Sequence, residues 1–564
     1  ARCAKVTCPT GDACVSYPDP VSQQCSSFGQ CETTQTYCTP IYKDAGESCG
    51  SGLACNGQGA CGSVCADNQV WCTSACVDPQ TDDAHCGADD NCSGGQACTD
   101  GTACEGGVCL VQCSGGDVRC DNTCIDPTSD STYCGASGSC SGATAGTECS
   151  AGACMQSKCR TWKGHSQLWD ASSGQGVSVF PTPNGDFLVT YTQYDINTST
   201  QDIWFDRYSA SAHSWAGGEH VEDIDLFANG GVAGVDGQGT TFAVWFQNDP
   251  NDGPTRIRTA SRSNAGWGSS IGLSAQGTIS MWPKLSILSN GDAIAAWGQQ
   301  ASTPSDPEHV YFARRTGGAW QNAAAVESQT GISQVQHLAA GGNGTAMVLW
   351  VNYPPSSTNS ALYASLWSGS SWGTPAKLAD DTTTKLYATS AGDSSGNYYV
   401  AWSESDSGVH RVKVRRYSAS TSTWGTVKTF VDAAGSYVST AVTNDGIPHI
   451  TWTDVDTKFT WVSTDPSNGD WLTPLTMGTG YGDAVGARCD SAGNVILLWR
   501  DNNVLKWRYK ASGASSFASE QPIMDLTGYV FSHAWAMNPD GSAMAGYSFG
   551  PGDGSANLGF NPFE

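Results

Sequence analysis

The second half of the chain repeats one pattern of apolar and polar positions. A glycine in a polar turn is followed six residues later by Trp or Tyr, and most residues between them are apolar. Apolar segments on both sides of an Asn/Asp/Ser/Gly turn, as in LSILSNGDAIAAW, predict a β-hairpin. The pattern occurs eight times, at intervals of 47 to 54 residues: Gly185/Tyr191, Gly239/Trp245, Gly291/Trp297, Gly344/Trp350, Gly396/Trp402, Gly446/Trp452, Gly493/Trp499 and Gly541/Tyr547.

Each copy continues with two more segments that read as strands. A third apolar segment follows the hairpin, as in HVYFARR, and a fourth short segment carries another aromatic residue. Four short strands at this period predict an all-β fold, an eight-bladed β-propeller over residues 160–564, with the repeated Trp residues packed between blades. The fourth-segment aromatic residues are Trp215, Trp267, Trp320, Trp372, Trp424, Trp471 and Phe517.

The last copy predicts how the propeller closes. Only 23 residues follow Gly541, whereas the fourth-segment aromatic falls 24 to 30 residues after the glycine in the other copies. Residues 161–168 have no hairpin before them and read like a fourth segment, with Trp162 as its aromatic residue. We therefore expect this segment to complete the last blade, which removes the exposed edge that an open array would present.

Cysteine residues are concentrated in the first part of the chain. Of the 26 Cys, 25 lie between Cys3 and Cys159, a density typical of a disulfide scaffold from an oxidising compartment. A structural zinc site is the alternative, but no C-x2-C pair is present. The first part is therefore predicted to be a small, loop-dominated, disulfide-rich region.

Two copies of one Cys-rich module follow a different Cys-rich N-terminal region. The spacing C-x6-C-x3-C-x9-C-x5-C starts at Cys65 and again at Cys113, which predicts modules over 65–112 and 113–159 after a region over 1–64. Segments so poor in large apolar residues need disulfides to fold, and eight Cys allow 105 connectivities. The cysteines expected in bridges are Cys65, Cys72, Cys76, Cys86, Cys92, Cys98, Cys104, Cys109, Cys113, Cys120, Cys124, Cys134, Cys140, Cys149, Cys154 and Cys159.

One cysteine of the N-terminal region lacks an obvious partner, because residues 1–61 contain nine Cys. It is free, bonded to another chain, or bonded to Cys489. Equivalent positions in other repeats hold apolar residues such as Val235 and Ile287. This favours a buried free thiol at Cys489 over a bridge to the Cys-rich region.

Both parts resemble known families. The run C-[VI]-D-P…C-G, at Cys76 and Cys124, resembles the Stig1-like Cys-rich repeat, which also occurs in large secreted proteins of myxobacteria. This resemblance implies an extracellular setting rather than an activity. The propeller repeats resemble BNR- and tectonin-like propellers of secreted bacterial proteins. They do not match the sialidase Asp-box S-x-D-x-G-x-x-W, because the spacing from glycine to aromatic residue is longer here.

The net charge of −26 constrains the partners. Nucleic acids and anionic membranes require clustered positive charge, which this chain lacks. No apolar run reaches the length of a membrane span, and no signal peptide is visible, so we expect a mature chain whose signal has been removed. A secreted or cell-surface protein without a cofactor fits best, although acidic loops are also compatible with calcium.

A ligand site is expected at the mouth of the propeller channel. Nine residues before the repeat glycine, near the start of each innermost strand, three copies carry aromatic residues whose faces suit sugar rings. The loops between the second and third strands add carboxylates to the same rim, which could bind sugar hydroxyls or form an acid/base pair. The candidate ligand-binding residues are Trp282, Tyr387, Tyr437, His533, Phe531, Asp306, Glu404 and Asp454.

Carbohydrate recognition, as an adhesin or a surface or matrix component, is the function that these residues favour. The partner would be a glycan, a surface polysaccharide or another extracellular protein. A polysaccharide lyase or glycoside hydrolase using rim carboxylates, with His533 or His337, is an alternative, but no catalytic residue is assigned. A structural subunit that self-associates through the Cys-rich region is a second alternative.

Overall fold

The computed structural model forms two compact units: residues 1–127 with 136–146, and residues 128–135 with 147–564. None of the helices in the described residues has the length and apolar character that crossing a bilayer requires. The structure describes residues 15–16, 40–44, 47–50, 53–55, 58–63, 65–72, 75–90, 92–164, 166–169, 175–195, 200–250, 253–301, 303, 306–355, 357–406, 408–431, 437–453, 458–465, 467–479, 486–501, 504–525, 529–550 and 557–564.

In the described residues of the first unit, short antiparallel strand pairs and one three-stranded sheet are joined by loops. Their strands have two to four residues, too few to bury an apolar core. A short 3-10 helix, Gly142–Thr144, follows them. The strands are β1 (Val15–Ser16), β2 (Ile41–Tyr42), β3 (Ser48–Gly50), β4 (Leu53–Cys55), β5 (Cys61–Ser63), β6 (Val70–Cys72), β7 (Ala75–Val77), β8 (Thr102–Glu105), β9 (Val108–Val111), β10 (Val118–Cys120) and β11 (Thr123–Ile125).

Disulfides take the place of an apolar core in the Cys-rich region. Both Cys-rich copies have the same connectivity: the first Cys bonds the third, the second the fifth, the fourth the seventh and the sixth the eighth. In the second copy, the last two bridges belong to the second unit. The pairs are Cys65–Cys76, Cys72–Cys92, Cys86–Cys104, Cys98–Cys109, Cys113–Cys124, Cys120–Cys140, Cys134–Cys154 and Cys149–Cys159, with Cys49–Cys61 before them.

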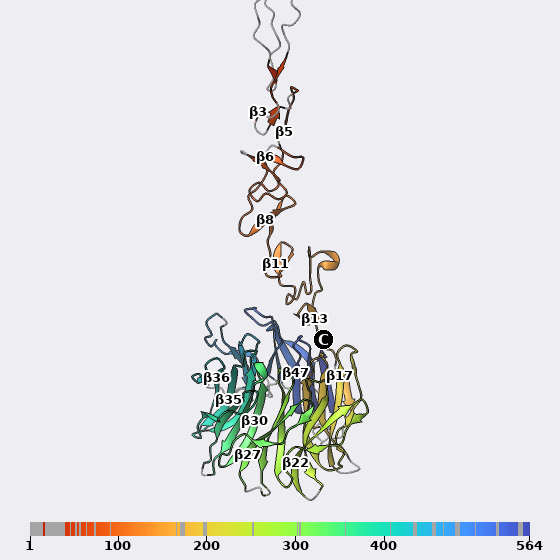
Figure 1. The fold of residues 1–564 in the computed structure, drawn as a ribbon, viewed down its shortest axis with the longest axis vertical. Coiled ribbons are helices and arrows are strands. Elements are labelled where there is room, and N and C mark those ends of the chain that lie inside the picture. The colour runs from red at the N-terminus through yellow and green to blue at the C-terminus, as the bar shows by residue number, and fades with distance from the viewer. Residues whose placement is uncertain are drawn as a thin grey trace, which may run out of the picture. The chain divides into compact units, whose positions relative to one another are not determined.

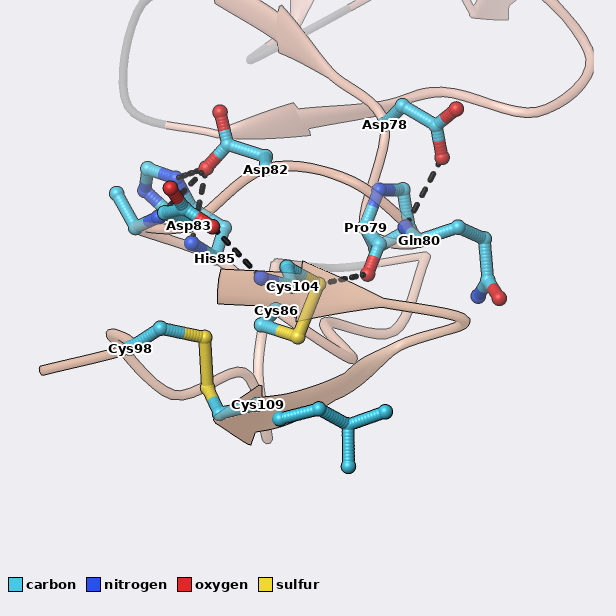
Figure 2. Close-up of a disulfide and its surroundings, with 12 residues drawn as sticks. Asp78, Pro79, Gln80, Asp82, Asp83, His85, Cys86, Cys98, Cys104 and Cys109 are labelled. Carbon is cyan, nitrogen blue, oxygen red and sulfur yellow. Dashed lines mark hydrogen bonds and ion pairs between the residues drawn. A yellow bond between two sulfur atoms is a disulfide. The ribbon is translucent and has the colours of Figure 1, made fainter. Parts of the chain in front are cut away.

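Aspartates of the first module hold its turns around the Cys86–Cys104 bridge (Figure 2). The Asp78 carboxylate accepts a hydrogen bond from the Gln80 backbone N–H at 3.0 Å, which forms an Asx turn. Asp83 accepts one from the Cys104 N–H at 2.7 Å, which joins the turn to β8. These carboxylates therefore satisfy backbone donors of the module.

The second unit is built from antiparallel sheets whose strands follow the chain order. Three sheets, each of five strands, have this simple order with an extra short strand pairing the third. They are β15 (Gln175–Pro181), β16 (Phe187–Asp195), β17 (Thr200–Ser209), β18 (Ser214–Trp215) and β19 (Glu219–His220); β20 (Ala228–Val235), β21 (Thr241–Asp249), β22 (Gly253–Ser263), β23 (Gly266–Trp267) and β24 (Ile271–Gly272); and β34 (Thr384–Gly392), β35 (Tyr398–Asp406), β36 (Val409–Ser418), β37 (Thr423–Trp424) and β38 (Lys428–Val431).

Two further sheets have four strands in chain order, and one sheet has nine. A single parallel pairing, Glu308 with Ile332, joins the two halves of the nine-stranded sheet. The four-stranded sheets are β39 (Val438–Val442), β40 (Pro448–Thr453), β41 (Lys458–Ser463) and β42 (Leu475–Thr479), and β43 (Gly486–Cys489), β44 (Val495–Asp501), β45 (Val504–Lys510) and β46 (Gln521–Asp525). The nine strands are β25 (Ile279–Ile287), β26 (Ala293–Gln300), β27 (Glu308–Thr316), β28 (Ala319–Trp320), β29 (Ala324–Ala325), β30 (Ile332–Ala340), β31 (Ala346–Tyr353), β32 (Ala361–Trp367) and β33 (Ala376–Ala379), with a 3-10 turn at Gly342–Gly344.

The remaining sheet joins both ends of the second unit. Its order is β14 (Ser166–Trp169), β49 (Asn557–Phe563), β48 (Ala543–Gly550) and β47 (Tyr529–Met537). Next to β14, Trp162 forms a bridge with Phe563, and the Thr161 N–H donates to the Glu564 carbonyl at 2.8 Å. The early segment therefore supplies the outer strand that the last copy lacks.

Contacts between innermost strands show that the sheets form a closed ring. Each of β15, β20, β25, β30, β34, β39 and β43 contacts the next in this order, β43 contacts β47, and β47 contacts β15. Figure 1 draws these two ends of the unit, coloured yellow and blue, next to each other. A ring of antiparallel sheets around a central axis is a β-propeller, which confirms that the fold is an all-β propeller.

The glycine and the aromatic residue of each repeat have separate structural roles. The repeat glycines adopt φ values between 69° and 88°, in the left-handed region that favours glycine at a hairpin turn. The paired aromatic residues, such as Trp297 and Trp350, are fully buried between neighbouring sheets. Fourth-segment aromatics pack on the preceding sheet, as Trp267 does edge-on to Phe205 at 5.1 Å.

A hairpin from the end of the second Cys-rich copy belongs to the core of the second unit. It is formed by β12 (Ala153–Met155) and β13 (Lys158–Arg160), and residues 153–155 are fully buried. Tyr509 donates its hydroxyl to the Cys154 carbonyl at 2.6 Å, and Gln156 donates to the Pro539 carbonyl at 2.8 Å. The hairpin thus packs at the repeat-glycine ends of the innermost strands.

Candidate functional site

The starts of the innermost strands contain a β-bulge in several sheets, at the position nine residues before the repeat glycine. In two sheets this position is Gly176 (φ 73°) and Gly230 (φ 66°), but in the next one it is Trp282, with φ 55°. A non-glycine residue in this region is strained by about 1–3 kcal/mol. The Trp282 side chain is nevertheless 56% exposed, so burial of the indole does not explain the strain.

Trp282 and Tyr387 line one cavity of about 450 Å³ at this end of the strands, which we call the mouth pocket. Phe246 of the preceding sheet braces the indole edge-on, at a ring-centroid distance of 4.9 Å. Tyr387 in turn lies beside Tyr437 of the following sheet, with centroids 4.8 Å apart and both side chains exposed. Polar lining comes from Lys284, Gln300, Glu308, Gln334 and Gln336.

Glu308 is the carboxyl group of the mouth pocket. It lies directly over Gly298, where any added Cβ would overlap its Oε1. Burial raises the pKa of Glu308 to about 7, and no described residue forms a hydrogen bond or ion pair with its carboxyl group. The group is therefore poised to exchange a proton near neutral pH.

Lys284 lies two residues after Trp282 on β25 and lines the same pocket. Burial lowers its pKa, and its ammonium group has no hydrogen-bond or ion-pair partner among the described residues. The pocket thus combines a solvent-facing aromatic surface, amide groups, one carboxyl group and one ammonium group without a partner.

Other candidate residues predicted from the sequence lie elsewhere or serve the fold. Asp306 accepts hydrogen bonds from the Thr303 N–H (3.0 Å) and hydroxyl (2.9 Å), so it caps its own loop. His533 is half-buried on β47, opposite Tyr547. Asp454 lies outside the described residues, as does the side chain of Phe531.

Glu404 is buried rather than on a loop at the rim, where the sequence placed it. Its side chain lies within β35 and is 2% exposed. Lys413 forms an ion pair with it, Lys385 approaches to 3.7 Å, and the Trp402 indole donates a hydrogen bond at 3.3 Å. These contacts lower the pKa of Glu404 against the effect of burial, so it is an internal counter-ion.

Sequence reasoning missed Lys284, although the repeat contains a signal for it. Seven residues before the repeat glycine, most copies carry small or apolar residues such as Ser178 and Val232, whereas two consecutive copies carry Lys284 and His337. Titratable side chains on innermost strands break the pattern in the same way as the aromatic residues. The glutamines of the pocket have no comparable signal.

Among the described residues, one set of side chains that contains no disulfide cysteine has spacing suited to a metal ion. Asp202, His220 and Glu222 have ligand atoms within 4.8 Å of one another. Both oxygens of Glu222 already accept the Ile203 N–H, and the hydrogen bond to Glu222 raises the pKa of His220. Glu327 accepts the Val310 N–H in the same way in another sheet, so this contact is part of the repeat.

No protein-family model and no curated protein match the chain. Solved structures similar to it include an unknown-function protein from Dyadobacter fermentans (10% identity, 72% of this chain and 99% of that chain, TM-score 0.37). The Dos1 propeller is another (11% identity, 71% and 94%, TM-score 0.44). A third is a PL25 ulvan lyase bound to -[GlcA(1-4)Rha3S]- (12% identity, 70% and 95%, TM-score 0.43).

Proposed function

We propose that this chain is a secreted carbohydrate-binding protein that holds glycan chains at the mouth pocket. The observation that carries this proposal is Trp282, which keeps a strained backbone conformation and an exposed indole where the two preceding copies have Gly176 and Gly230. Strain of this kind persists where the surrounding structure enforces it, often at ligand sites.

The chemistry of the mouth pocket suits sugars. Pyranose rings have an apolar C–H face that stacks on aromatic side chains, and their hydroxyl groups need hydrogen-bond partners at the edges. Trp282 and Tyr387 supply the faces, and Gln300 and Gln334 supply amide donors and acceptors. A volume of about 450 Å³ is within the usual range for small-ligand sites.

We also propose the number of blades, the role of the Cys-rich modules and an extracellular location. Counting the two halves of the nine-stranded sheet separately gives eight blades, closed by the segment 161–168, in a propeller of the BNR- and tectonin-like type. The Stig1-like modules over 65–112 and 113–159, after the Cys-rich region 1–64, would hold the propeller at a surface or in a matrix. Their disulfides indicate an oxidising, extracellular environment.

A glycan array with purified full chain tests the proposal. We expect binding to a defined set of glycans that is lost in Trp282→Gly and weakened in Tyr387→Ala. Ile271→Ala is the matched control, because Ile271 is also 56% exposed but lies on β24, outside the pocket. An array on which no glycan binds, or on which the three variants behave alike, contradicts the proposal.

Glycan cleavage is a second candidate because of Glu308. A carboxyl group with a pKa of about 7 can act as a general acid or base, and Lys284 lines the same pocket. A lyase would release unsaturated uronic products, which absorb ultraviolet light. An absorbance that rises with wild-type protein but not with Glu308→Gln would support this activity. If the absorbance stays constant with every polysaccharide that the protein binds, the protein binds glycans without cleaving them as a lyase.

A further inference from the structure

The innermost strands enclose a second cavity, of about 680 Å³, which we call the channel cavity. Its lining comes from most of the ring, including Ser286 of β25, His337 of β30, Ser390 of β34, Arg488 of β43 and Trp535 of β47. It borders the mouth pocket, since Ser286 and His337 lie two and one residues from the pocket residues Lys284 and Gln336.

The lining of this channel differs in charge from the rest of the molecule. The chain has 53 acidic residues against 27 Lys and Arg. Yet the eight strands that form the inner ring contain no Asp or Glu. They do contain Lys284, Arg488 and His337, as well as Lys385 and His533.

Lys284 and Arg488 have no acidic partner among the described residues, in contrast to the buried cations Lys385 and Arg315. Lys385 lies 3.7 Å from Glu404, and Arg315 donates to Asp236 at 3.0 Å. Arg488 instead donates to the carbonyls of Ala487 and Trp535, and its guanidinium lies over the Trp535 ring at 5.2 Å. Both cations are half-buried, and the strands that carry them supply no carboxylate to compensate their charge.

His337 adds an uncharged donor near both cations, whose positive charges act on its imidazole. Burial, together with the positive charges of Lys284 and Arg488, lowers its pKa to about 4, so the imidazole is neutral at physiological pH. Its Nδ1 accepts the Ser390 backbone N–H at 3.3 Å, which leaves the proton on Nε2. The Nε2–H is then available to donate to a ligand oxygen.

We infer that an anion-binding site lies where the channel cavity meets the mouth pocket, with Lys284 on the pocket side and His337 and Arg488 on the channel side holding a carboxylate or sulfate group. Charge-assisted hydrogen bonds from ammonium and guanidinium groups are the strongest that such a site can offer. The anion would replace the counter-charge that the lining lacks. Because the cavity borders the mouth pocket, the glycan would be an acidic one, a step that rests on the proposed function.

Calorimetric titration of the full chain tests this inference with four probes. Oligogalacturonides carry carboxylates, heparin-derived oligosaccharides carry sulfates and carboxylates, cello-oligosaccharides are neutral, and sodium sulfate supplies the anion alone. Lys284→Gln is the informative variant, because it removes a charge without breaking a described contact. Lys377→Gln is the matched control, since Lys377 is exposed on β33 beside Asp381.

We expect acidic oligosaccharides to bind more tightly than neutral ones, and their affinity to fall about tenfold or more in Lys284→Gln but not in Lys377→Gln. Added salt should weaken the same binding. Comparison of oligogalacturonides with heparin oligosaccharides identifies the preferred anion. Arg488→Gln should act in the same direction, and Lys284→Gln decides the matter if Arg488→Gln does not fold.

Two results separate this inference from the proposed function. Equal affinity for acidic and neutral oligosaccharides, or unchanged acidic binding in Lys284→Gln, overturns the anion site. If no oligosaccharide binds while sulfate binds in a manner that depends on Lys284, the anion site stands and glycan recognition fails.

Discussion

The indole of Trp282 lies over Gly230 of the preceding sheet. A Cβ built on Gly230 would be 3.5 Å from Cε3 of Trp282 and under 3 Å from the Phe246 ring. The two residues occupy the same position of consecutive repeats, and both have positive φ. One copy therefore provides the space that the side chain of the next copy fills, so the exposed indole is fixed in position by the repeat itself.

Trp282→Gly should separate stability from binding. Glycine relieves the left-handed strain but loses the contact with Phe246, so we expect the melting temperature to change little. Glycan binding should fall at least about tenfold, because stacking on one aromatic face contributes roughly 1–3 kcal/mol. Trp297→Gly is the contrasting variant: its buried indole makes a loss of about 3–5 kcal/mol of stability the expected result. A large loss of stability in Trp282→Gly would show that the indole serves the fold.

Glu308 should make the stability of the protein fall as the pH rises. Its pKa is about 7 in the folded chain and 4.5 as the reference, so the folded state binds the proton more tightly. This contribution is complete below about pH 4.5 and is lost as the pH rises through about 7. Glu308→Gln does not titrate, so its stability relative to wild type should increase across this window by up to about 3 kcal/mol. Melting temperatures of both proteins at about pH 4 and about pH 8 test the sign, and parallel pH profiles would contradict it.

The fold could be predicted because its signals are local. Gly291 and Trp297 are six residues apart within one hairpin. Gly291 forms the turn, and the buried Trp297 makes the contact between sheets. The pairing of β14 with β49 could be anticipated too, because a missing strand at one end of the repeat matched an extra one at the other. Neither inference required knowledge of distant contacts.

The site was less predictable because it depends on pairing between strands. The segment SESDSG reads as a polar loop, but pairing of β35 with β36 extends the strand to Asp406 and buries Glu404. Glu308 begins β27, and only its approach to Gly298 on β26 places its carboxyl group in the pocket. Composition cannot distinguish a strand end from a loop in such segments.

Met155 should be important for the stability of the second unit, although it comes from a Cys-rich copy. Its side chain is fully buried in the cluster that includes Trp507 and Phe563, and it packs at Gly541. Met155→Ala should cost about 2–5 kcal/mol. Lys158→Ala, at an exposed position of the same hairpin, is the control and should have little effect. Thermal unfolding followed by near-ultraviolet circular dichroism measures both, and equal transitions would show that the hairpin is not part of the cooperative unit.

Glu404→Gln tests whether this carboxylate is an internal counter-ion or a ligand group. The substitution leaves Lys385 and Lys413 without their shared negative charge, and disruption of a buried pair costs about 3–5 kcal/mol. Asp406→Asn, two residues further along β35, breaks a half-exposed pair with Arg411 and should cost about 0–1 kcal/mol. Below its melting transition, Glu404→Gln should bind glycans as wild type does, because the carboxylate does not line the mouth pocket. Reduced affinity with an unchanged melting temperature would instead make Glu404 part of the ligand site, and the mouth pocket would have to extend to β35.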